Sequence, residues 1–181
     1  MIDEENDGAV LSFLVPCAVA ADFRALNYGE DCADLEARES LLGAVPARDR
    51  TDEGRPFFIF QGEYRGRLVY ISYTCPDGKF SAGSYLFERT TFELGKQIYT
   101  ELKRHLSKEF GSPFFDEDSE EYRKKLSEDV RKMSEAQRYS AMWSSGNSVI
   151  SSALYGPAGG DGWQVAISYR PKGDLPVGIV K

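Results

Sequence analysis

The chain has 181 residues, of which 41% are hydrophobic, 28% are charged and 13% are aromatic. These fractions are typical of a globular protein, and the aromatic content excludes a disordered chain. A formal net charge of −7 excludes the basic face with which proteins bind nucleic acid. No apolar run reaches the roughly 18 residues that a membrane-spanning helix requires. We therefore expect neither a nucleic-acid partner nor a membrane span.

Residues 1–20 have most features of a cleavable signal peptide. Val10–Val15 is an apolar run, Pro16 interrupts it, and Ala18–Ala20 is a small-residue cleavage site. The residues before the run are acidic where a signal peptide carries Lys or Arg, and a buried N-terminal strand is the alternative. We expect the segment to be removed and the protein to be periplasmic or secreted, with a cytoplasmic location as the alternative.

The cysteines give a second indication of the compartment. Removal of residues 1–20 would take Cys17 away and leave Cys32 and Cys75. Two remaining cysteines in an exported protein predict one disulfide. We expect this bond to tie the first helix to a strand of the first sheet. The alternative is two buried free thiols, which behave as small hydrophobic groups.

The first half of the mature chain predicts a short helix and three strands. The helix follows Asp31 and ends near Leu42, because Gly43 fits the left-handed position after a helix and Pro46 prevents its continuation. Strands are expected at the apolar runs that follow, the second of which alternates at period two. Their ranges are Phe57–Tyr64, Leu68–Cys75 and Phe80–Phe87.

The second half predicts a longer helix and three more strands. Apolar residues recur every four positions from Leu94 to Phe110, which is the period of an amphipathic helix, and Gly111 ends it. Residues 119–134 are highly charged and are expected to form an inserted, largely solvated helix. The expected strands are Tyr139–Ser145, Ser148–Tyr155 and Trp163–Arg170.

The same order of elements thus occurs twice, with a glycine and a proline after each helix. We therefore predict an α+β fold that is a tandem repeat of a helix plus a three-stranded antiparallel sheet, with the helices packed on one sheet face. The first unit would span residues 21–90 and the second residues 91–175. Residues 176–181 would be a tail.

No residue pattern indicates catalysis, a cofactor or a metal. His105 is the only histidine, and no motif supplies a nucleophile or an orienting carboxylate for it. The acids at 116–121 lack the spacing of a calcium loop and suit the start of a helix. Gly159–Gly162 lacks the Lys-Ser/Thr of a phosphate loop. We expect a protein that is not an enzyme, and the alternative is a hydrolase with an unrecognised carboxylate pair.

Tyrosine and tryptophan are frequent in the expected strands. Side chains that face away from the helices would form a protein-binding surface, because Tyr and Trp dominate binding hot spots. The alternative is that they fill the core. The candidate binding residues are Tyr64, Tyr70, Tyr73, Trp143 and Trp163. A small-ligand or lipid carrier, with an apolar cavity between helices and sheet, is the alternative function.

Short motifs spread over residues 22–170 carry a family resemblance. They are the opening DFRALNYGEDCADLEARE, the hairpin YTCPDGKFSAGSYLFE, the Phe-Gly-x-Pro end of the second helix and the strand AMWSSGN. The arrangement resembles that of β-lactamase-inhibitor-protein-like domains and of small outer-membrane lipoproteins that assist barrel assembly. The resemblance implies an exported inhibitor or envelope-assembly factor that binds a protein partner. It assigns no functional residue and no oligomeric state.

Overall fold

The computed structural model describes residues 21–24, 26–47, 57–117, 137–156 and 162–174. The predicted signal peptide, the charged segment 119–134 and the tail 176–181 lie outside these residues. The elements in chain order are α1 (Leu35–Leu41), β1 (Val45–Pro46), β2 (Phe57–Tyr64), β3 (Arg67–Thr74), the 3-10 turn η2 (Pro76–Gly78), β4 (Ala82–Phe87), α2 (Phe92–Phe110), β5 (Phe115–Asp116), β6 (Gln137–Ser145), β7 (Ser148–Tyr155), β8 (Gln164–Pro171) and the 3-10 turn η4 (Lys172–Asp174).

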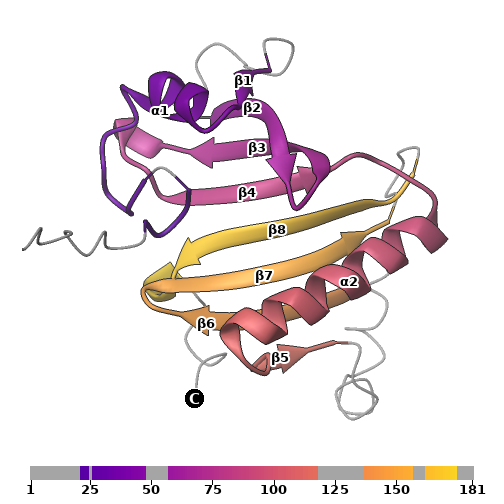
Figure 1. Ribbon diagram of the computed structural model, residues 1–181. Helices are drawn as coiled ribbons and strands as arrows, with labels where there is room; N and C mark the ends of the chain where they lie inside the picture. The colour runs from indigo at the N-terminus through magenta and orange to yellow at the C-terminus, as the bar shows by residue number, and fades with distance from the viewer. Residues whose placement is uncertain (1–20, 25, 48–56, 118–136, 157–161, 175–181) are drawn as a thin grey trace, which may run out of the picture.

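The strands form one antiparallel sheet in the order β1-β2-β3-β4-β8-β7-β6-β5 (Figure 1). The prediction of a tandem α+β repeat with two three-stranded sheets was therefore wrong. Strand β4 pairs with β8 from Gly83 opposite Tyr169 to Leu86 opposite Ala166. A three-stranded sheet that ended at β4 would leave unpaired backbone N–H and C=O groups along that edge. Pairing β4 with β8 satisfies them and fuses the strands into a single sheet.

The local patterns of the sequence account for the individual elements. In β3, buried Val69, Ile71 and Tyr73 alternate with more exposed side chains, as period two requires. In α2, the buried positions Ile98, Leu102 and Leu106 follow the helical period. Thr91 accepts a hydrogen bond from the Leu94 N–H at the start of α2, and Gly111 ends the helix with φ of 85°.

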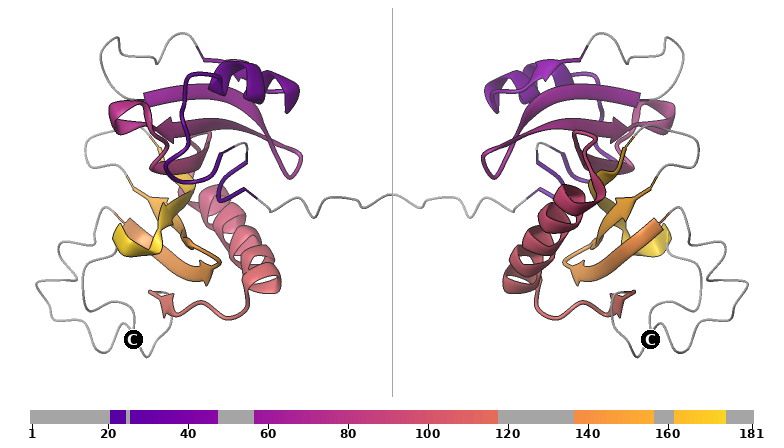
Figure 2. Two further views of the ribbon diagram at one scale, coloured as in Figure 1. Left: turned by 90° about the vertical axis from the view of Figure 1, so that its left-hand side faces the viewer. Right: turned by 90° about the vertical axis from the view of Figure 1, so that its right-hand side faces the viewer.

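Both described helices pack on the same face of the sheet. The register places Tyr73, Gly83, Tyr169, Ile150 and Trp143 in one row across five strands, so these residues share a face. Tyr73 bonds to Glu39 of α1 at one end of the row, and Trp143 bonds to Ser107 of α2 at the other. We call this the helix face. The turned views show α2 lying along one side of the strands (Figure 2).

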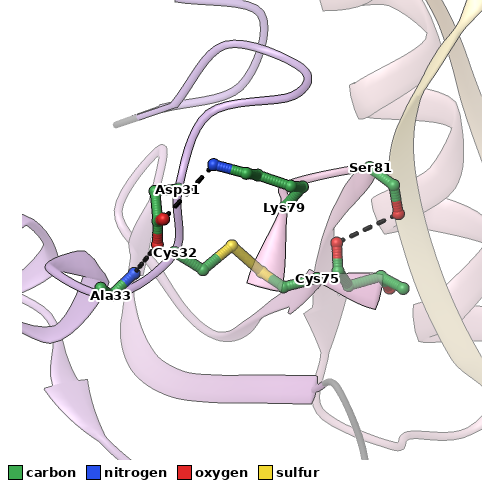
Figure 3. The surroundings of a disulfide bond; sticks show 7 residues. Asp31, Cys32, Ala33, Cys75, Lys79 and Ser81 are labelled. Carbon is green, nitrogen blue, oxygen red and sulfur yellow. Dashed lines mark hydrogen bonds and ion pairs between the residues drawn. A yellow bond between two sulfur atoms is a disulfide. The ribbon is translucent and has the colours of Figure 1, made fainter. Parts of the chain in front are cut away.

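The predicted disulfide is confirmed. Cys32, just before α1, bonds to Cys75 at the end of β3, and both residues are buried (Figure 3). Beside it Asp31 accepts a hydrogen bond from the Ala33 N–H and forms an ion pair with Lys79 at 3.3 Å. The bond joins residues 43 positions apart. It fixes the segment before α1 to the end of the sheet.

Candidate functional site

Two of the five predicted binding aromatics lie inside the core. Tyr73 and Trp143 are both 0% exposed. The Tyr73 hydroxyl donates to the Glu39 carboxylate, and the Trp143 Nε1–H donates to the Ser107 hydroxyl at 3.3 Å. These two side chains hold the helices on the sheet. Neither has surface available to a partner in the folded protein.

The other three predicted aromatics are half-buried and lie apart from one another. Tyr64 packs on Tyr85 on the helix face, with ring centroids 4.4 Å apart. Trp163 packs on Phe92 at the start of α2, with centroids 4.8 Å apart. Tyr70 lies on the opposite face, because it alternates with buried Val69 and Ile71 along β3. The structure does not bring the five residues together into one patch.

The opposite face of the sheet carries a row of serines. Ser72, Ser84, Ser168 and Ser151 are cross-strand neighbours on β3, β4, β8 and β7. The hydroxyl of Ser84 donates to that of Ser168 at 3.0 Å. Small side chains make this row flat, but they do not define the chemistry of a ligand.

On the helix face, residues 21–30 cross the sheet between α1 and α2. We call this segment, apart from residue 25, the strap. The Phe23 ring occupies the space above Gly83, where any Cβ would overlap it. Phe23 also contacts Tyr73, Tyr85 and Tyr169, each with a centroid distance of 5.1 Å. A glycine at position 83 is thus what allows the strap to approach the sheet.

Arg24 fixes the strap to α1 through a buried ion pair. Its guanidinium donates to both carboxylate oxygens of Glu39, at distances of 2.9–3.2 Å. Glu39 is 0% exposed and the Arg24 side chain is 14% exposed. Burial of Arg24 lowers its pKa, but the hydrogen bond and charge of Glu39 outweigh this, so the pKa lies above its ordinary value. The Tyr73 hydroxyl is a further donor to Glu39. The carboxylate is thus fully used by interactions inside the fold.

Further contacts order the rest of the strap. The Tyr28 hydroxyl lies 3.0 Å from that of Ser148 at the start of β7, and the Tyr28 ring stacks on Phe80. The Asp22 carboxylate accepts a hydrogen bond from the Tyr28 N–H at 3.0 Å. The Gly29 N–H donates to the Phe80 carbonyl. The strap is thus anchored on both sides of Phe23.

A groove of about 350 Å³ lies between the strap and the end of α2. Strap residues 21–24 form one wall, and Glu109 and Phe110 of α2 form the other. The turn between β6 and β7, residues 145–148, closes one end. The floor consists of Tyr85, Ile150 and Tyr169. The groove therefore brings together residues from five parts of the chain that are separate in sequence.

The groove tyrosines keep their protons at neutral pH. Burial raises the pKa of Tyr85 to about 12, with the Arg24 guanidinium acting in the opposite direction. Burial also raises the pKa of Tyr169, helped by the neighbouring Tyr64 and Tyr85 and by the Glu109 carboxylate. Neutral phenols offer a ring face for packing and a hydroxyl for hydrogen bonding. The floor can therefore hold an apolar or cationic group and fix its orientation.

The rim of the groove carries charges that are less buried. Glu109 forms an ion pair with Arg65 of the β2–β3 turn at 3.2 Å, and the two side chains are 52% and 42% exposed. The Arg65 guanidinium also lies over the Tyr64 ring, 5.8 Å from its centroid. An ion pair with this exposure contributes little to stability. The Glu109 carboxylate remains accessible to a ligand.

The other sequence features that invited a chemical interpretation have structural roles where they are described. His105 is a partly exposed residue of α2 near Glu101, with Nε2 4.0 Å from the carboxylate. Asp116 forms an ion pair with Lys103 at 2.7 Å. Within the described ranges no group of three His, Cys, Asp or Glu side chains is arranged to hold a metal. Residues 118–121 and 159–161 lie outside those ranges.

Sequence reasoning did not single out the residues that form the groove. Tyr85 and Tyr169 follow the period-two pattern of their strands. This pattern predicts which face of the sheet each side chain occupies, but not which residues it contacts. Only the pairing of β4 with β8 places them side by side, with centroids 6.2 Å apart. Phe23 and Arg24 lie in a segment without regular periodicity. No signal in the sequence identified them.

Comparisons with protein-family models, with curated proteins and with solved structures find no match for this chain. Among the described residues, no helix is long and apolar enough to cross a membrane.

Proposed function

We propose that this protein is an exported, non-catalytic binding protein that receives a segment of a protein partner in the groove between the strap and α2. Export is supported by the apolar run and small-residue site in residues 1–20 and by the Cys32–Cys75 bond. Disulfides persist in oxidising compartments and are rare in a reducing cytoplasm. An inhibitor role and an envelope-assembly role both remain compatible with this proposal.

The observation that carries the proposal is the composition of the groove. Its floor is made of aromatic and aliphatic side chains, and its rim is made of polar and charged ones. Interfaces have this anatomy, with a desolvated core in which tyrosine is enriched and a polar rim. The floor is held in place by the strap and by the central strands of the sheet. A partner segment would therefore meet a preformed surface, which lowers the entropic cost of binding.

The volume of the groove also favours a second candidate, a small-ligand binding protein. About 350 Å³ lies at the lower end of the range found for ligand pockets. Glu109, Asp22 and Asn147 on the rim favour a polar compound over a lipid, because an acyl chain gains most from an enclosed apolar cavity. This candidate and the protein partner make different predictions in one experiment.

Site-specific photocrosslinking tests the proposal with a matched pair of positions. Ser145 pairs with groove residue Ser148 on the helix face, whereas its neighbour Ser144 pairs with Val149 on the opposite face. Benzoylphenylalanine is placed at either position in the full-length protein, which is expressed in its native organism and irradiated. We expect a discrete protein adduct from position 145 and none of the same mass from position 144.

The outcomes separate the two candidates. Equal adducts from both positions, or no adduct of any kind from position 145, would contradict a binding site in the groove. An adduct of a few hundred daltons at position 145 would favour the small-ligand candidate. Mass spectrometry of the same samples tests export, because the mature chain should begin at Ala21.

A further inference from the structure

The groove contains three features that favour a positive charge. The carboxylates of Asp22 and Glu109 lie on opposite walls. The last turn of α2 ends at the groove, and the C-terminal end of a helix carries partial negative charge on its free carbonyls. The ring faces of Tyr85 and Tyr169 on the floor carry the negative part of the aromatic quadrupole. These groups come from four separate elements and converge on one space.

The protein already places its own cations on this group of rings. The Arg24 guanidinium lies 6.0 Å from the centroid of the Tyr85 ring, and that of Arg65 lies 5.8 Å from the centroid of Tyr64. Tyr64 and Tyr85 are packed together, so both cations use one aromatic cluster. Each guanidinium is also paired with a carboxylate, Glu39 and Glu109 respectively. Tyr85 is only 7% exposed, because Tyr64, Phe23 and Arg24 cover it. An external cation at the groove would therefore use the partly exposed Tyr169 and the half-exposed Glu109 carboxylate.

We propose that the partner's segment enters the groove through a basic side chain, an arginine or a lysine, which lies on Tyr169 and pairs with Glu109; this inference rests on the proposed function. Glu39 neutralises Arg24 inside the fold, so Arg24 does not repel the incoming charge. Arg65 is the internal competitor for Glu109. An acidic side chain would instead meet Asp22, Glu109 and the helix end, and would be rejected.

The probe is N-acetyl-arginine N-methylamide, and its control is the corresponding citrulline derivative, which has nearly the same shape and no charge. Each is titrated into ¹⁵N-labelled full-length protein, and amide shifts are followed at Gly146, Asn147 and Glu109. We expect the arginine derivative to shift these amides and the citrulline derivative to bind about tenfold more weakly, because it lacks both the ion pair and the cation–π contact.

Two substitutions should change the affinity in opposite directions. Glu109→Gln removes the carboxylate and should weaken arginine binding about threefold. Arg65→Asn removes the internal competitor and should strengthen it about threefold; asparagine tolerates the positive φ of 51° at this turn position. Glu101→Gln is the matched control, because Glu101 lies on the same helix as Glu109, pairs with Arg67 of β3 and does not line the groove. It should leave the affinity unchanged.

The results distinguish this inference from the proposed function. Equal binding of the arginine and citrulline derivatives would overturn the proposal that a basic side chain enters the groove, and so would equal effects of Glu109→Gln and Glu101→Gln. Either result would leave the groove itself as a binding site. Absence of any shift up to 50 mM of either probe would also overturn that proposal. Crosslinking at position 145 then decides separately whether the groove binds a partner.

Discussion

Glu39 is a buried acidic residue at a position where the neighbouring polar residues predict an exposed side chain. It lies in a short helix among Glu36, Arg38 and Ser40, yet it has no exposed surface. Its two oxygens receive the Arg24 guanidinium and the Tyr73 hydroxyl. Removing one member of such a cluster leaves the others buried without a partner, which costs more than the cluster contributes.

We expect Glu39→Gln to lower the free energy of unfolding by about 3 kcal/mol, because it leaves the Arg24 charge buried and unpaired. Glu101→Gln is the matched control, because its ion pair with Arg67 is largely exposed and should change stability by under about 1 kcal/mol. Urea unfolding followed by circular dichroism measures both. A loss for Glu39→Gln no larger than that of the control would show that the buried pair does not hold the strap.

At the scale of the elements, the strap is the part of the fold that creates the groove. It lacks regular secondary structure, so its position depends on its anchors. Phe23 over Gly83 and the Arg24 ion pair hold its first half. The Cys32–Cys75 bond fixes the chain just after its last residue. Loss of an anchor should therefore affect the groove as well as stability.

Reduction of the Cys32–Cys75 bond should lower the free energy of unfolding by about 4 kcal/mol, which is what a closed loop of 43 residues implies on the chain-entropy account. The measurement is urea unfolding of the oxidised protein and of the Cys32→Ser, Cys75→Ser double variant. Cys17→Ser, made in the full-length chain, is the control and should leave the free energy of unfolding unchanged. Equal stability of the oxidised protein and the double variant would refute this role of the disulfide.

At the scale of the whole molecule, the central pair β4–β8 makes the sheet continuous. On either side of this pair the strands run outward in reverse chain order, β3, β2 and β1 on one side and β7, β6 and β5 on the other. A two-residue strand forms each edge. Short edge strands limit pairing with other chains. The strap also crosses this junction, since Phe23 contacts Tyr85 of β4 and Tyr169 of β8. The groove therefore exists only when both sets of strands are assembled.

A continuous sheet predicts cooperative unfolding. Amides in the centres of β3 and β7 should exchange hydrogen with the same free energy, equal to that of global unfolding, because neither strand can open without losing the β4–β8 junction. Hydrogen exchange at a series of low denaturant concentrations, followed by NMR, provides the comparison. A free energy for β7 clearly below that for β3 would mean that the two sets of strands unfold independently.

Much of the element content could be predicted, because it depends on neighbours in the chain. The four-residue spacing from Leu94 to Phe110 predicts α2, and alternation in β3 predicts a strand. The site could not be predicted in the same way. Tyr28 bonds to a residue 120 positions away, and no local pattern encodes such a contact. Burial of Tyr73 and Trp143 likewise depends on which face the helices cover.

The sequence by itself determined the two helices among the described residues and most of the strand positions, since these follow from local periodicity. It also indicated the cysteine pair, through the expectation that Cys17 belongs to a cleaved segment. Only the tertiary structure decided that β4 joins β8, that Glu39 is buried with Arg24, and that Phe23 crosses Gly83. The physical reason is that backbone pairing and charge pairing are satisfied by whichever groups the fold brings within reach. The sequence does not specify which groups will pair with a strand edge, a charge or an aromatic ring, because these partners come together only when the sheet forms.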